Sequence, residues 1–172
     1  MNTVETDNNS KPFSRIQHFL PLLVSLLLSY SAAGVGGMAS VNAEEFYSLL
    51  IRPNWSPPPS VFGPVWSVLY TLIALSAWLV WLKKQFTVSL PYLIFAAQLL
   101  ANALWSWIFF YWQLGLIAIL EIALLCILIV FNAASFYRIS KTAGLLLLPY
   151  LCWVSFATLL STVLWLNNPA LL

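Results

Sequence analysis

Three apolar segments of this 172-residue chain carry aromatic and amide side chains at helical spacing. Residues at i, i+4 and i+7 of a helix lie on one face, so each set would form a stripe. The stripes are Phe62, Trp66 and Tyr70; Gln98, Asn102, Trp105 and Phe109; and Tyr150, Trp153, Ala157 and Leu160. Stripes that face one another would enclose a flat-walled pocket with few polar groups, which suits a flat apolar ligand. The alternative is that the rings only fill the space between helices.

Other residue types that carry chemistry are isolated along the chain. Glu121 is the one acid inside an apolar segment, where such a group is either functional or a hydrogen-bonded structural residue. His18, the only histidine, falls at a predicted membrane edge, and Cys126 and Cys152 lie in apolar runs as small buried residues without a disulfide. The sequence contains no catalytic triad, no phosphate-binding glycine loop and no metal-spaced cluster. We therefore expect no metal site and no required cofactor.

The composition predicts the elements that position these residues. The chain is 62% hydrophobic and 7% charged, whereas soluble domains carry roughly 25% charged residues. It is therefore expected to be an all-α integral membrane protein without a nucleic-acid partner, because a helix of about 20 apolar residues spans a bilayer. The predicted transmembrane domain, residues 18–167, contains five helices at about 18–41, 61–82, 90–112, 114–137 and 143–166. Outside the helices we expect a disordered polar tail at 1–17, short loops, a longer proline-rich loop at 42–60 and a C-terminal tail at 168–172.

The first apolar segment is interpreted as a retained helix. Its length exceeds the roughly 7–15 residues of a signal-peptide core, so we do not expect it to be cleaved. Ser29, Ala33 and Gly37 form a row of small residues that allows another helix to approach closely. The row could pack inside the bundle or form a contact in a homodimer.

The basic residues predict an orientation. With five spans, the tail and the second and fourth connections lie on one side, which carries all but Arg52 of the seven lysines and arginines. Lysine and arginine mark the cytoplasmic side of membrane proteins. We therefore expect a cytoplasmic N-terminus and an external C-terminus.

The stretch RPNWSPPPSVFGPVWSVLY, residues 52–70, contains five prolines next to two tryptophans. Consecutive prolines form a stiff extended segment with few unfolded conformations to lose. This segment could act as a lid over the bundle that carries Trp55 onto a cavity. Alternatively, it is a surface loop with Trp55 anchored at the membrane interface.

Three motifs occur in chain order. The first spans the proline-rich loop and the second predicted helix, and the other two lie on the third and fifth predicted helices. They are Pro53-x-Trp55-x-Pro57-Pro58 with Gly63-Pro64-Val65-Trp66-x-x-Leu69-Tyr70; Ala97-Gln98-Leu99 with Asn102, Trp105 and Phe109-Phe110; and Pro149-Tyr150-Leu151-x-Trp153-x-x-Phe156-Ala157. Over about residues 20–167 the chain therefore resembles the translocator protein / tryptophan-rich sensory protein family (TspO/peripheral benzodiazepine receptor). The absence of a tyrosine and a basic residue in Ser161–Asn167 is unlike the cholesterol pattern of animal members and favours a bacterial-type member.

The resemblance implies a five-helix bundle, often a homodimer, that binds tetrapyrroles such as protoporphyrin or haem. For this chain it implies a protein of the bacterial inner (plasma) membrane. It also implies a pocket lined by a set of residues from the three stripes, with Trp55 in the lid. The pocket residues are Trp66, Asn102, Trp105, Trp153 and Ala157, with Tyr70, Phe109 and Tyr150 as neighbours, and Gln98 and Asn102 could hold a ligand carbonyl or propionate.

Three functional hypotheses follow. The first is a receptor, sensor or carrier for porphyrin-type ligands. The second, also implied by the resemblance, is light-dependent breakdown of bound porphyrin assisted by Trp66 or Trp153, in place of a conventional catalytic set. The third is a packed structural bundle without a cavity, and transport of lipids, sterols or other small molecules stays open beside these.

Overall fold

The computed structural model describes the backbone of residues 15–84 and 89–172, and side chains from Phe19 onward within those ranges. Of the polar tail expected at 1–17, residues 1–14 lie outside the described residues, whereas the backbone of α1 already begins at Arg15; the side chain of His18 also lies outside the described range. The all-α class is confirmed, because the described elements are all helical. In chain order they are α1 (Arg15–Ala39), α2 (Ala43–Leu49), the 3₁₀ turn η1 (Pro59–Val61), α3 (Phe62–Lys83), α4 (Leu90–Ser106), the π-helical turn η2 (Trp107–Tyr111), α5 (Gly115–Ile139), α6 (Lys141–Leu146) and α7 (Leu148–Asn167).

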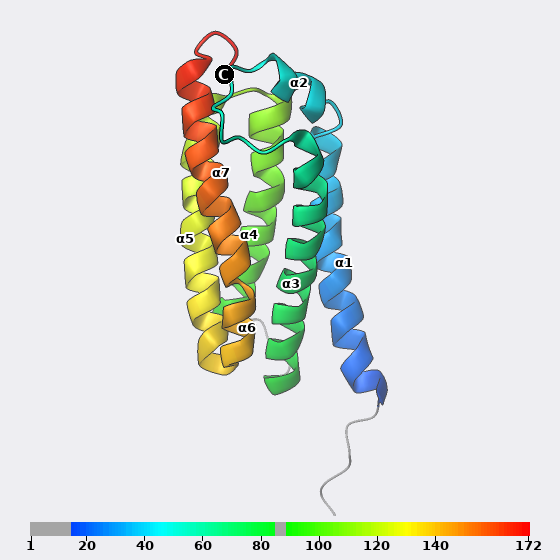
Figure 1. Ribbon diagram of the computed structural model, residues 1–172. Coiled ribbons are helices and arrows are strands. Elements are labelled where there is room, and N and C mark those ends of the chain that lie inside the picture. The colour runs from blue at the N-terminus through cyan, green and yellow to red at the C-terminus, as the bar shows by residue number, and fades with distance from the viewer. Residues whose placement is uncertain (1–14, 85–88) are drawn as a thin grey trace, which may run out of the picture.

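The long helices form an elongated bundle whose helices run roughly side by side (Figure 1). Five helical stretches in the described part of the chain are long and apolar enough to cross a membrane. These are Phe19–Ala39, Pro59–Lys83, Leu90–Tyr111, Gly115–Ile139 and Lys141–Asn167. Large apolar side chains such as Leu27, Leu100 and Leu120 are more than half exposed on the outside of the bundle. Because lipid tails are as apolar as these side chains, such a surface is stable in a bilayer, and the protein is an integral membrane protein.

The helices pack in a fixed order around one core. α1 contacts α3 and α4, while α5 contacts α4 and α7. Between α4 and α5, Phe95 and Phe136 stack with their ring centroids 6.0 Å apart. Between α3 and α6, the Ser76 hydroxyl donates a hydrogen bond of 2.7 Å to the Ala143 carbonyl. α3, α4 and α7 each place buried side chains in this core, such as Ile73, Leu99 and Val154.

Two of the predicted helices are interrupted. The third ends in the π-helical turn η2, in which the Trp112 N–H donates to the Trp107 carbonyl at 2.8 Å. The fifth is divided at Leu147 into α6 and α7, since Pro149 lacks an N–H and occupies the first turn of a new helix. The sequence pattern predicted both segments as continuous, because their apolar character does not change across the breaks.

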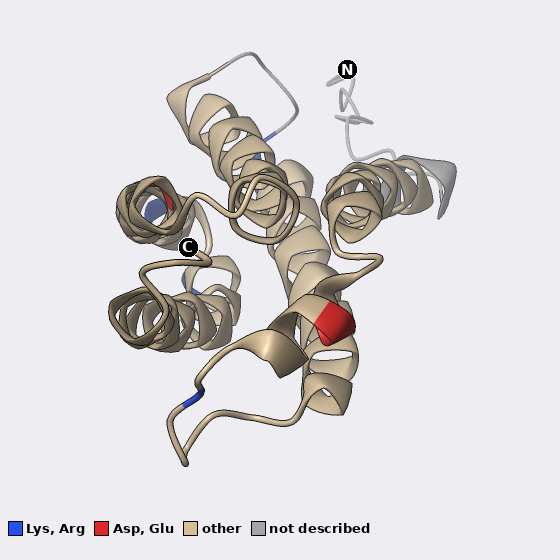
Figure 2. Ribbon diagram, turned by 90° about the horizontal axis from the view of Figure 1, so that it is seen from above, with Lys and Arg blue, Asp and Glu red and all other residues tan. Residues whose placement is uncertain are grey.

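The segment between α1 and α3 is more ordered than the loop expected at 42–60. It contains the short helix α2, whose first turn carries Glu44 and Glu45, where acidic side chains interact favourably with the helix dipole. We call the end of the bundle that holds this segment and the C-terminus the loop end. Figure 2 shows it from above, with acidic residues on α2 and a basic residue on the loop that follows.

A prediction for stability comes from Gly144, where α6 meets α5. A Cβ atom on Gly144 would lie 2.5 Å from Tyr137 Cβ and 2.8 Å from the Ala133 carbonyl oxygen. Because the second contact is with backbone, Gly144→Ala should force the helices apart and cost about 1–3 kcal/mol. The measurement is thermal unfolding in detergent. Gly34→Ala is the control, because a Cβ there meets nothing within 4 Å, and equal midpoints for the two variants would contradict the packing described.

Candidate functional site

A cavity of about 750 Å³ lies inside the loop end of the bundle. Its walls come from α1, α3, α4 with η2, and α7, and α2 with η1 borders its outer end. The residues that line it include Tyr30, Ala33, Gly34, Gly36, Gly37, Ser40, Glu44, Tyr47, Pro59, Phe62, Gly63, Trp66, Ser67, Tyr70, Asn102, Trp105, Ser106, Phe109, Phe110, Trp153, Ala157, Leu160 and Ser161. A volume between about 300 and 1,000 Å³ is typical of sites for small molecules.

Aromatic rings form much of the wall. Trp105 stacks on Phe109 with centroids 5.1 Å apart and planes 13° apart. On the other side, Phe62 meets Trp153 edge to face at 5.9 Å. The π-helical turn brings the consecutive residues Phe109 and Phe110 both to the cavity, which fits the frequent occurrence of such turns at functional sites. The cavity therefore offers flat apolar surfaces on more than one side.

A chain of polar side chains crosses the bundle next to these rings. The Tyr70 hydroxyl donates a hydrogen bond to Asn102 Oδ1, and Asn102 Nδ2 donates to the Tyr150 hydroxyl at 3.0 Å. Tyr70 is on α3, Asn102 on α4 and Tyr150 on α7, so a single amide connects three helices. All three side chains are buried, where a polar group without a partner would be costly.

Comparison with known proteins shows which family this chain belongs to. Residues 23–166 match the TspO/MBR family. The chain belongs to the TspO/MBR family. The match covers most of the described residues, including every residue that lines the cavity.

The relatives of this TspO/MBR family member include bacterial and animal proteins. It is 40% identical to the "Tryptophan-rich protein TspO" of Chlorobaculum tepidum, over 86% of this chain and 95% of the relative. It is 35% identical to the "Translocator protein" of Homo sapiens, over 72% of this chain and 75% of the relative. It is 31% identical to the "Tryptophan-rich sensory protein" of Cereibacter sphaeroides, over 80% of this chain and 85% of the relative.

Most of the residues predicted from the sequence of this family member lie together at the cavity. Seven of them line it, namely Trp66, Tyr70, Asn102, Trp105, Phe109, Trp153 and Ala157. Tyr150 is fully buried behind the wall, where it holds Asn102 and packs edge-on against Trp66 at 6.2 Å. The aromatic stripes of the three helices therefore converge around a cavity. The first hypothesis requires such a cavity, whereas the hypothesis of a packed structural bundle excludes it.

Gln98 and Glu121 lie away from the cavity. Gln98 is fully buried one turn from Asn102 and does not line the cavity, and neither end of its amide has a hydrogen-bond partner among the described residues. Glu121, on α5, also lacks a hydrogen-bond partner there, and α5 supplies none of the residues that line the cavity. Both side chains therefore require a role other than direct contact with a ligand in this cavity.

Trp55 lies beside α7 and not over the mouth of the cavity, where a lid residue would lie. Its ring packs edge-on against Phe156 of α7 at 5.9 Å, is 47% exposed and does not line the cavity. The border at the outer end is formed instead by Tyr47, Pro59 and Ser60. In the described structure Trp55 holds the loop against α7.

Sequence reasoning missed the contribution of α1 to this family member's cavity. Gly34, Gly36 and Gly37 line it, together with Gly63 on the facing helix α3. The signal was the row of small residues, which we interpreted as a packing surface. Gly34, Gly37 and Gly63 are also exposed residues, so backbone as well as side chains forms the accessible wall of the cavity where α1 faces α3.

The polar chain gives a testable prediction. Asn102→Leu should lower the free energy of unfolding by about 1–3 kcal/mol for each tyrosine hydroxyl that loses its partner. Adding Tyr70→Phe and Tyr150→Phe to this variant should recover most of the loss, because no unpaired polar group then remains. Thermal unfolding of the three proteins in detergent measures the effect. A triple variant no more stable than Asn102→Leu alone would show that the hydrogen bonds do not carry the stability.

Proposed function

We propose that this protein is a membrane receptor or sensor that binds a flat porphyrin-type tetrapyrrole in the cavity at its loop end. Membership of the TspO/MBR family supports a receptor or sensor role in a membrane. The observation that carries the choice of ligand is the cavity of about 750 Å³, whose wall includes aromatic rings of α3, α4 with η2, and α7. Each ring that stacks on a flat ligand adds about 0.5–1.5 kcal/mol beyond the burial of apolar area.

The wall chemistry favours protoporphyrin over haem as the ligand. No histidine, cysteine or methionine lines the cavity along the described part of the chain, so the usual axial ligands of haem iron are missing. The tyrosine hydroxyls on the wall are engaged elsewhere. Tyr30 bonds with Thr71, Tyr47 donates to the Pro57 carbonyl, and Tyr70 donates to Asn102. Stacking and burial are therefore the contacts that these wall residues offer to the macrocycle.

The ligand proposal predicts a specific loss of affinity. Trp66→Leu combined with Trp153→Leu should weaken protoporphyrin binding about tenfold or more, because two stacking surfaces are removed. The shift of the porphyrin absorption band on titration measures the affinity without depending on protein fluorescence. The control is Trp112→Leu, which removes a tryptophan that does not line the cavity. Equal affinities of the double variant and the control would argue against the site.

We further propose that the loop end faces away from the cytoplasm. Lys83, Lys84, Arg138 and Lys141 lie at the opposite end of the bundle, whereas Arg52 is the basic residue of the loop end. This asymmetry follows the positive-inside rule.

The orientation can be measured in intact bacterial cells with a membrane-impermeant maleimide. In a background without Cys126 and Cys152, a cysteine at exposed Ser60 should be labelled from outside. A cysteine at exposed Lys141 should be labelled only after the cells are opened. The reverse pattern would overturn the orientation.

A further inference from the structure

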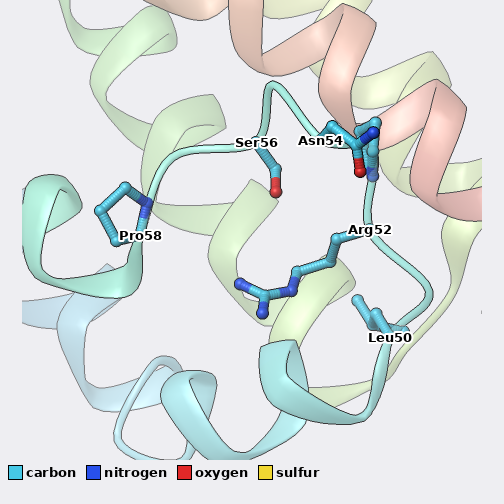
Figure 3. Close-up of a pocket in the computed structure, with 6 residues that line it drawn as sticks. Leu50, Arg52, Asn54, Ser56 and Pro58 are labelled. Atoms are coloured by element: carbon cyan, nitrogen blue, oxygen red, sulfur yellow. The ribbon is translucent and has the colours of Figure 1, made fainter.

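A second hollow of about 450 Å³ lies within the loop that joins α2 to η1. It is lined by Leu50, Arg52, Pro53, Asn54, Ser56 and Pro58. Figure 3 shows that Arg52 extends from the loop into the middle of this hollow and that Ser56 points toward the same space. The hollow therefore presents a guanidinium group with hydroxyl and amide groups around it.

The Arg52 guanidinium is held in place without being neutralised. Its central carbon lies 4.8 Å from the centroid of the Tyr47 ring, a cation–π contact. The N–H donors of a guanidinium lie in its plane and point outward from its edge. Among the described residues, Arg52 forms no ion pair, and the side chains of Asn54 and Ser56 form no hydrogen bond. The donors around the hollow are thus available to a ligand.

The backbone beside Arg52 is fixed to the end of α7. Asn168 Oδ1 accepts a hydrogen bond of 2.8 Å from the Ile51 N–H, and Asn168 Nδ2 donates to the Ile51 carbonyl at 3.2 Å. The same Nδ2 donates to the Leu164 carbonyl at 2.8 Å, and Asn168 is buried. Because the residue before Arg52 is held on both its polar groups, the loop does not have to become ordered when an anion binds.

The hollow adjoins the aromatic cavity. Tyr47, which carries Arg52 on its ring, is also a wall residue of the cavity. Pro58 borders the hollow, and its neighbour Pro59 borders the cavity. The two spaces therefore border one another at Tyr47 and at Pro58–Pro59, and Arg52 is the basic residue at the border.

A carboxylate on the ligand needs a cationic partner such as Arg52, because the polar side chains that the sequence predicted as its partners are not available. Gln98 lies away from the cavity, and the Asn102 amide is already bonded to two tyrosines. Glu44, an exposed residue at the cavity border, would repel a carboxylate. Within the described loop end, Arg52 is the cation that can attract one.

We propose that Arg52, with Asn54 and Ser56, forms a subsite for a carboxylate of the ligand whose flat body lies in the aromatic cavity. This inference rests on the proposed function and adds an orientation to it. A porphyrin would bind with its propionate edge toward the loop end and its apolar edge toward Asn102. The planar guanidinium can donate two parallel hydrogen bonds to one carboxylate.

The test compares protoporphyrin with its dimethyl ester, which keeps the macrocycle and lacks the carboxylates. Both are titrated into the full chain in a non-ionic detergent at low salt, for the wild type and Arg52→Gln. Arg52→Gln should weaken binding of the acid about fivefold, the scale of a solvent-accessible charge pair, and leave binding of the ester unchanged. Raising the salt concentration should reduce the difference. Arg138→Gln, which removes a cation from the opposite end of the bundle, is the matched control.

The outcomes separate the two proposals. If Arg52→Gln affects acid and ester equally, or neither, the carboxylate subsite is overturned while the cavity proposal stands. If neither compound binds the wild type, both proposals fail. A lipid phosphate offers the same chemistry as a carboxylate, but non-ionic detergent contains none. An effect that appears only after phosphatidylglycerol is added, and equally for both compounds, would assign Arg52 to the lipid and overturn the inference.

Discussion

The Asn102 amide is the interaction on which the rest of the site depends. It accepts a hydrogen bond from Tyr70 and donates one to Tyr150, and so fixes how α3, α4 and α7 are rotated toward one another. No water is available in a bilayer core to replace these partners, which makes other rotations costly. Each of the three residues lies one turn from a tryptophan on the loop-end side, namely Trp66, Trp105 and Trp153. Fixing the polar layer therefore also fixes an indole layer directly beside it.

The cavity exists because helices of different character face each other. α3, α4 with η2, and α7 supply most of the large rings, and α1 supplies Gly34, Gly36 and Gly37 beside the single ring of Tyr30. A bundle with large residues on every inner face would close, since protein interiors pack as densely as organic crystals. The combination of rigid aromatic walls and a glycine wall leaves a space that the protein itself does not fill.

The sequence predicted the helical class, the membrane setting and the convergence of three stripes, because each depends on residue spacing and composition alone. Ser29, Ala33 and Gly37 of α1 were identified as a packing row, but α1 was not identified as a cavity wall, since small residues serve both purposes and only the tertiary arrangement distinguishes them. The positions of Trp55 and Gln98 relative to the cavity could not be read from spacing, because a loop has no period and a helical face is wider than a cavity. The π-helical turn and the break at Leu147 depend on local backbone geometry, which cannot be predicted from a run of apolar residues. Homodimer formation stays a prediction.

The apolar lining of the cavity has a consequence for any measured affinity. In a bilayer or a micelle, an acyl chain competes for the same aromatic and glycine surface as a flat apolar ligand. The free protein is then not an empty receptor in water but one solvated by lipid or detergent tails. An apparent dissociation constant therefore measures the exchange of hydrocarbon for ligand. Its value depends on the lipid or detergent as well as on the protein.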